Sequence, residues 1–106
     1  MDVNFENVTA MAKANVYFDG KVISHAIFTA QGERKTLGLF MPGEYEFGTE
    51  AAEVMDITDG SCRVKLPGTS EYTEVKAGES FTVPANSKYK LCCDAILQYV
   101  CSYIGN

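Results

Sequence analysis

The chain has 106 residues, of which 46% are hydrophobic, and a formal net charge of −5, and this length and composition predict a single compact domain with one core. Because contacts to phosphate groups require a basic surface, nine Lys and Arg against fourteen Asp and Glu disfavour a nucleic-acid-binding protein. No apolar run is long enough to span a bilayer, and the residues after Met1 are acidic and mixed, so we expect a cytoplasmic protein that does not contact a membrane.

The first fourteen residues carry a pattern that the rest of the chain does not repeat. Their apolar side chains are spaced as in one or two short amphipathic turns. We therefore divide the chain into an N-terminal extension, residues 1–14, which packs on the domain or on a partner subunit, and a single domain, residues 15–106.

From residue 15 onward, short runs of alternating apolar and polar residues are separated by turn residues, which is typical of β-strands. The first strand ends at Asp19-Gly20, a dipeptide that favours a tight hairpin turn because both central residues need positive φ. Further strands are expected over residues 21–28, 34–40, 44–47, 54–57, 61–66, 72–75, 81–83, 87–93 and 95–104.

Two features of these strands bear on the fold. Asp59-Gly60 lies between two apolar runs and predicts a second hairpin. The last run, residues 95–104, is largely apolar on both faces, which predicts a central strand or one buried at an interface. About ten short strands without a long helix predict an all-β fold, an antiparallel β-barrel or double-sheet jelly roll whose interior can hold one small ligand.

The four cysteines are Cys62, Cys92, Cys93 and Cys101. Two of them are adjacent and point to opposite faces of a strand, and none forms a C-x2-C pair typical of zinc sites. Buried thiols in a reducing compartment are the favoured interpretation, and disulfides are the alternative.

Two blocks of the sequence resemble the two motifs of cupin barrels. Glu53, followed after six residues by Gly60, matches the end of the first motif. Gly78, followed after five residues by Pro84, matches the beginning of the second. The resemblance implies an antiparallel, cupin-like barrel of the RmlC-like kind.

The histidines of the cupin motifs are missing. Positions 46–49 hold Glu, Phe, Gly and Thr, and Tyr89 stands where the second motif has its histidine. The only histidine, His25, lies outside both blocks, whereas a first-row metal in such a pocket needs imidazole ligands. We therefore expect no metal, and a pocket lined by aromatic and polar side chains.

A longer series of residues resembles the small cupin-fold pyrimidine/purine nucleoside phosphorylases, in order and at nearly constant spacing from about residue 15 to residue 104. It is carried by Tyr17-Phe18-x-Gly20-Lys21-Val22, Met41-Pro42-Gly43-Glu44-Tyr45-x-Phe47, Ala77-Gly78-x-Ser80-Phe81-x-Val83-Pro84 and Tyr99-x-Cys101-x-Tyr103. The chain departs from the family pattern after Pro84. The resemblance implies phosphorolysis of purine and pyrimidine nucleosides to free base and α-ribose 1-phosphate by a homodimer, with phosphate as co-substrate and no cofactor.

Nucleoside phosphorolysis passes through an oxocarbenium-like transition state with phosphate as the nucleophile, so the site needs a cationic seat for phosphate. Arg34 is the leading candidate because a guanidinium forks onto phosphate oxygens. Lys21, Ser24 and Ser87 are candidate helpers. The competing interpretation makes Arg34 a solvated residue of a hairpin.

The ribose and the departing base need hydrogen-bonding groups, for which Glu53 and Glu44 are candidates. Glu53 occupies the position of a cupin metal ligand and is expected to point inward; otherwise it is a glutamate at a strand edge in water. Thr49, near a former imidazole position, bonds ribose or phosphate, or is an ordinary strand threonine.

The base needs a flat apolar slot, and aromatic side chains of the motif strands can provide it by stacking. The candidates are Tyr45, Phe47, Phe81, Tyr89 and Tyr103. The competing interpretation is core packing, since a barrel interior requires aromatic or aliphatic residues at alternate strand positions.

Two functions from other classes stay open at this point. A metal-dependent cupin enzyme, such as a dioxygenase or isomerase, is disfavoured by the missing histidines. A non-catalytic module that binds a sugar or another small molecule is compatible with the fold, since fold alone does not determine function.

Overall fold

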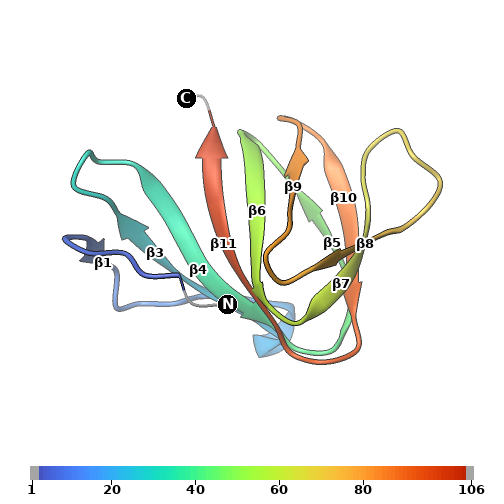
Figure 1. Ribbon diagram of the computed structural model, residues 1–106, viewed down its shortest axis with the longest axis horizontal. Coiled ribbons are helices and arrows are strands. Elements are labelled where there is room, and N and C mark those ends of the chain that lie inside the picture. The colour runs from blue at the N-terminus through green and yellow to red at the C-terminus, as the bar shows by residue number, and fades with distance from the viewer. Residues whose placement is uncertain (1–2, 105–106) are drawn as a thin grey trace.

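Two antiparallel sheets contain almost all of the regular structure in residues 3–104, the part of the chain that the computed structural model describes (Figure 1). In chain order the elements are β1 (Thr9–Ala10), β2 (Asn15–Tyr17), the single-turn 3-10 helix η1 (Phe18–Gly20), β3 (Val22–Phe28), β4 (Arg34–Phe40), β5 (Gly43–Gly48), β6 (Ala52–Asp59), β7 (Ser61–Lys65), β8 (Thr73–Lys76), β9 (Ser80–Val83), β10 (Lys88–Cys93) and β11 (Leu97–Ile104). The strands expected from the alternating pattern are confirmed. None of the described helices could cross a membrane.

The larger sheet has the strand order β1-β3-β4-β11-β6-β9, with β2 added beside β3, and the smaller sheet has the order β5-β10-β7-β8. The smaller sheet lies against the β6 and β11 region of the larger one, and β1, β3 and β4 extend beyond it (Figure 1). The expected all-β architecture is confirmed in its jelly-roll form, because the described strands make two facing sheets that do not close into one barrel.

The final strand, β11, lies between β4 and β6 in the larger sheet, which confirms the prediction of a central strand. Leu97, Tyr99 and Cys101 face the interior and are buried. Val100 faces the opposite side and is still buried, since Val3 and Phe5 lie beside it across the outer face of the sheet. Burial on both faces accounts for the apolar character of the whole strand.

The two Asp-Gly dipeptides have different roles. Asp19-Gly20 connects β2 to β3 in a hairpin, with φ of 55° and 90° at the two residues, as the prediction requires. The hairpin predicted at Asp59-Gly60 is wrong, because β6 pairs with β11 and β9, and β7 pairs with β10 and β8. This second dipeptide carries the chain from one sheet to the other, with positive φ at Gly60 but not at Asp59.

The amphipathic turns predicted in the N-terminal extension are also wrong for its described residues, 3–14. Thr9 and Ala10 form β1, which pairs with the end of β3, and the Met11 N–H donates to the Ala26 carbonyl at 2.9 Å. Backbone pairing with an open sheet edge thus takes precedence over the weak helical spacing. The division of the chain at residue 15 stays a prediction.

The hydrophobic core lies between the two sheets. Its largest fully buried side chains include Phe40, Met55, Ile57, Leu91 and Leu97. All four cysteines are free and buried, and burial raises the pKa of the Cys62 thiol to about 12. Aliphatic side chains fill one part of the interior, and aromatic ones line the part that holds the pocket described next.

Candidate active site

A pocket of about 180 Å³ lies between the two sheets. Its aromatic lining consists of Tyr17, Phe40, Phe47, Tyr89, Tyr99 and Tyr103. Its polar lining consists of Ser24, Thr36, Glu53 and Cys101, and Gly48 and Met55 complete it. These residues come from β2, β3, β4, β5, β6, β10 and β11, so strands of both sheets contribute to one cavity.

Sheet register aligns the polar wall of the pocket. Thr36 on β4 is opposite Cys101 on β11, and Glu53 on β6 is opposite Tyr103. Gly38 lies between Ser24 and Tyr99 in neighbouring strands. A Cβ atom on Gly38 would lie 2.6 Å from the Tyr99 hydroxyl oxygen, so the missing side chain lets the tyrosine ring lie across β4.

Arg34 brings a positive charge to one end of the pocket. Its guanidinium carbon lies 4.7 Å from the centre of the Tyr103 ring, a cation–π arrangement. The Tyr103 hydroxyl is 3.3 Å from the Thr36 Oγ1, within hydrogen-bond distance. An exposed guanidinium held against a ring, with two hydroxyls beside it, is suited to binding an anion.

Glu53 is half-buried and lies close to this cation. Burial raises the pKa of its carboxyl group, whereas a hydrogen bond with Cys101 and the charge of Arg34 act in the opposite direction. Burial also raises the pKa of the Cys101 thiol to about 12, so the thiol stays protonated and acts as a donor. The carboxylate keeps acceptor capacity for a hydroxyl in the pocket.

Aromatic rings form the opposite wall. Phe47 and Tyr89 are stacked, with ring centres 6.0 Å apart and an angle of 23° between their planes. Tyr17 meets Phe47 edge-on, at 6.1 Å and 83°. Burial raises the pKa of both Tyr89 and Tyr99, so their hydroxyls stay neutral hydrogen-bond donors. A flat heterocycle can pack against a wall of such rings.

Ser24 supplies a buried hydroxyl to the same wall. The Asn15 side chain donates to the Ser24 Oγ at 3.3 Å, and Ser24 also bonds with the Tyr99 side chain. The two strands β2 and β3 therefore hold a polar group beside the aromatic rings, where it can reach a hydroxyl or a ring nitrogen of a ligand.

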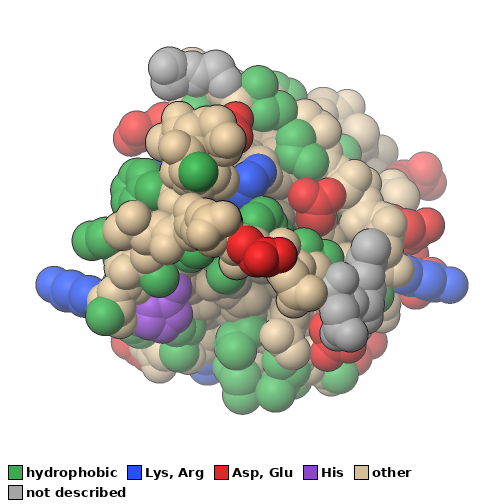
Figure 2. Space-filling view, turned by 60° about the vertical axis from the view of Figure 1, so that its left-hand side comes forward, with side chains coloured by type: hydrophobic (Ala, Val, Ile, Leu, Met, Phe, Trp, Pro, Cys, Tyr) green, Lys and Arg blue, Asp and Glu red, His purple; other side chains and the backbone are tan. Residues whose placement is uncertain are grey.

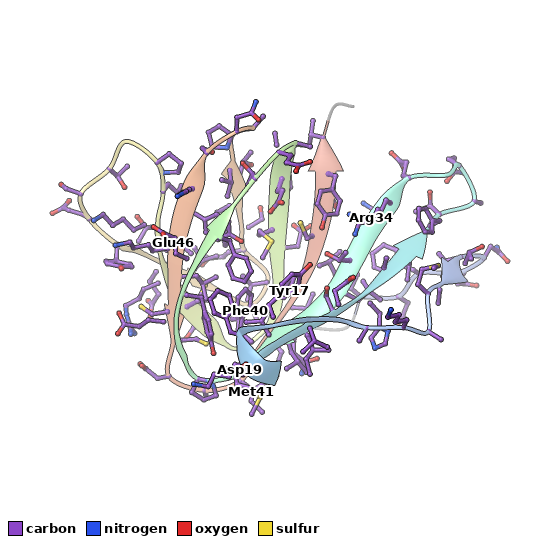
Figure 3. All side chains as sticks on the ribbon, turned by 180° about the vertical axis from the view of Figure 1, so that it is seen from behind. Tyr17, Asp19, Arg34, Phe40, Met41 and Glu46 are labelled. Atoms are coloured by element: carbon purple, nitrogen blue, oxygen red, sulfur yellow. The ribbon has the colours of Figure 1, made fainter. Side chains whose placement is uncertain are left out.

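Six of the residues expected from the sequence gather at this pocket. Ser24, Phe47, Glu53, Tyr89 and Tyr103 line it, and Arg34 lies against Tyr103. Figure 3 shows Arg34 at the end of β4 that is remote from Tyr17 and Phe40. The roles of these residues stay predictions. The contact between Arg34 and the Tyr103 ring disfavours the alternative interpretation, in which Arg34 is only a solvated hairpin residue.

Four other candidates lie elsewhere. Tyr45 is part of the core, where its hydroxyl donates to the Met41 carbonyl at 2.7 Å. Phe81 is buried in the core against Tyr89. Glu44 is exposed on the outer face of β5, and the exposed Lys21 follows η1. None of these side chains lines the described pocket.

Thr49 and Ser87 hold two loops together instead of lining the pocket. The hydroxyls of both residues donate to the Pro84 carbonyl, each at 2.6 Å. The Ser87 N–H donates to the Thr49 Oγ1 at 3.1 Å. This network fixes the connection before β10, which carries Tyr89, and so supports the site from outside.

Sequence reasoning missed several lining residues. They are Tyr17, Thr36, Phe40, Met55, Tyr99 and Cys101. Strand alternation could have found some of them, because Thr36 follows Arg34 by two residues and Cys101 and Tyr99 precede Tyr103 by two and four. Tyr17 had no such signal, since its position depends on how the β2 hairpin crosses the opening between the sheets.

His25 lies outside the pocket. It is exposed on β3, the Nδ1 atom is 3.1 Å from the Met11 carbonyl oxygen, and the imidazole is visible at the surface in Figure 2. In the part of the chain that the structure describes, no three His, Cys, Asp or Glu side chains are grouped so that they could hold a metal ion.

Sequence comparison assigns the chain to a family that is described as pyrimidine/purine nucleoside phosphorylase, whose model matches residues 12–103. Proteins of that name from Leptospira interrogans and Hydrogenovibrio crunogenus are 53% and 55% identical, over 96% and 94% of this chain and 96% of each relative.

Solved structures agree on the fold. A protein of unknown function from Acinetobacter sp. ADP1 has a TM-score of 0.94 at 42% identity, covering 95% of this chain and 98% of its own. An RmlC-like cupin from Shewanella frigidimarina is 19% identical, with a TM-score of 0.68, and the match covers 86% of this chain and 81% of the cupin. At this identity the likeness shows that the fold is shared and nothing more. The family match spans most of the chain at high identity, and the chain therefore belongs to the pyrimidine/purine nucleoside phosphorylase family.

Proposed function

We propose that the chain catalyses the phosphorolysis of purine and pyrimidine nucleosides to free base and α-ribose 1-phosphate, with inorganic phosphate as co-substrate and no cofactor. The proposal is supported by family membership and by one observation above all. A guanidinium, a half-buried carboxylate and stacked aromatic rings surround a single pocket.

Phosphate binds at Arg34, whose guanidinium donates to two phosphate oxygens and balances their charge. The Thr36 and Tyr103 hydroxyls, 3.3 Å apart beside it, can donate to the remaining oxygens. This places a phosphate oxygen at the polar end of the pocket, from which it attacks C1′ of the ribose.

In the reaction, the C1′–N bond breaks with its electron pair going to the base, and a bond from a phosphate oxygen to C1′ forms. The Glu53 carboxylate accepts hydrogen bonds from ribose hydroxyls and stabilises the positive charge that develops on the sugar ring. The neutral hydroxyl of Tyr99 can donate to the departing base, which then takes a proton from solvent.

Incubation of the purified protein with uridine or inosine, with and without phosphate, tests the proposal. We expect release of free base only when phosphate is present, one ribose 1-phosphate per base, and unchanged rates after dialysis against a chelator. Release without phosphate would identify a hydrolase. Binding without release would identify the small-molecule-binding module, and loss of activity on chelation would revive the metal-dependent enzyme.

We also propose that the protein is a homodimer. Ile23, Leu37 and Leu39 are only partly covered on the outer face of the larger sheet, and a second copy could bury them. Sedimentation equilibrium should give twice the chain mass of 11.6 kDa. A mass of one chain at all concentrations would contradict the dimer.

The proposed location is the cytoplasm, as expected from the sequence. The four free, buried cysteines support it, because a reducing compartment keeps thiols in this state. Cell fractionation is the direct check, and recovery of the protein with secreted markers would overturn it.

A further inference from the structure

The pocket is small for a whole nucleoside. Its volume is about 180 Å³, below the roughly 300–1,000 Å³ of pockets that bind drug-sized molecules. Enclosing a nucleoside would require at least one wall to move outward, and the strands differ in how easily they can do so.

Most of the walls are held on both sides. Tyr89 lies on β10, which pairs with β5 and β7, and Tyr99 lies on β11, which pairs with β4 and β6. Both side chains are buried, at 4% and 8% exposure. Moving either ring would break sheet hydrogen bonds or core packing.

Tyr17 is the exception. Its side chain is 47% exposed, and it lies on β2, a strand of three residues that pairs with β3 alone. Figure 3 shows Tyr17 between β5 and β4, where the β2–η1 arm crosses the open side of the pocket. A short edge strand of this kind opens at lower cost than the rest of the sheet.

The turn after Tyr17 is conformationally strained and held by one ring. Phe18 and Asp19 have φ of 52° and 55°, in the left-handed region that is unfavourable for a bulky residue. The Phe18 ring packs against Tyr45 and Phe47, with ring centres 5.1 Å and 5.3 Å away. Phe18 thus anchors the arm while Tyr17 lies over the pocket.

The two ends of the pocket determine the direction in which the substrate lies. Arg34 and Gly38 are four residues apart on β4, about 13 Å at the usual rise per residue. With phosphate at Arg34 and ribose beside Glu53, the base reaches the end formed by Tyr17, Phe47 and Tyr89.

We propose that Tyr17 determines specificity between bases: it is the adjustable wall of the base slot, against which a single-ring pyrimidine is held and which a double-ring purine displaces. The inference rests on the proposed phosphorolysis. A pyrimidine covers less of the fixed Phe47–Tyr89 wall, so it depends more on Tyr17 for contact. A purine keeps more contact with the fixed rings when Tyr17 is removed.

The test is the ratio of kcat/KM for uridine to that for inosine in Tyr17→Ala. We expect kcat/KM for uridine to fall about tenfold, the size of one lost base–aromatic stack, and that for inosine to fall no more than about threefold, because part of its stacking surface remains on the fixed rings. The KM for phosphate should be unchanged. Tyr17→Phe should restore the wild-type ratio, since the ring does the stacking.

Val16→Ala is the matched control, because Val16 is on the same strand, exposed, and absent from the pocket lining. Phe18→Gly is a second variant that keeps the backbone conformation and removes the anchor, and it should shift the ratio in the same direction. Equal losses for both nucleosides in Tyr17→Ala, or no loss, would overturn the inference. A wild-type protein without phosphate-dependent base release would instead overturn the proposed function.

Discussion

Replacing Arg34 with alanine should lower kcat/KM for phosphate about 100-fold, because a hydrogen bond to a charged group contributes roughly 1.5–3 kcal/mol. The loss should appear mainly in the KM for phosphate, and the KM for nucleoside should change little. Steady-state kinetics with phosphate as the varied substrate measure it. Arg34→Lys should recover only part of the loss, since an ammonium cannot make the bidentate contact.

Lys35→Ala removes the same charge from the neighbouring residue and is the matched control. The Lys35 ammonium donates to the Ser102 Oγ at 2.8 Å, on the face of β4 opposite to Arg34. It should leave the phosphate kinetics intact. If the two alanine variants lost equal activity, the effect would come from net charge, and Arg34 would not be the phosphate seat.

Glu53→Gln should lower kcat by about 10²–10³, because the variant keeps the shape of the side chain and removes the charge that faces the sugar in the transition state. The wild-type pH profile should also change. Burial raises the pKa of Glu53, so wild-type kcat/KM should fall as the pH drops through a value above the ordinary range of a glutamate. That acidic limb should be absent from the variant.

The same substitution should raise stability while it lowers activity. A carboxyl whose pKa is higher in the folded state binds its proton more tightly there, so its contribution to stability is present at low pH and is lost as the pH rises through the raised pKa. Glutamine does not ionise, so the variant does not lose stability as the pH rises. Thermal unfolding should therefore give a higher Tm for the variant at pH 7 and a smaller difference near pH 4. A variant with wild-type kcat, or with kcat and Tm both lowered, would contradict the role of Glu53.

Much of the architecture could be predicted because strand alternation reports which side chains share a face. The pattern at β4 and β11 predicted both strands, and the apolar character of the last strand predicted its central position. Glu53 and Tyr89, at positions where cupins carry metal ligands, do line the pocket. Those positions face inward because the register of the sheet determines the face to which each position points, whichever side chain occupies it.

The remaining errors concern how deeply a side chain is buried and which strands pair. The alternation within a single strand contains neither kind of information. Tyr45 and Phe47 are two residues apart on the same face of β5, yet the first is core and the second borders the cavity. Both rings contact Phe18 and Phe40. They differ in their other partners, because the Tyr45 hydroxyl donates to the Met41 carbonyl and the Phe47 ring stacks beside Tyr89 at the pocket. Asp59-Gly60 shows the same limit, since a turn dipeptide specifies a reversal but not the sheet that the next strand joins.

The buried thiols have a consequence for the chemistry of the intact protein. With the pKa of Cys62 and Cys101 at about 12, almost no thiolate exists at physiological pH, and both sulfur atoms are shielded from solvent. Cys62 lies in the core between the sheets, so alkylating and oxidising agents reach it only when the two sheets separate. The rate at which Cys62 is modified therefore reports how often the sandwich opens.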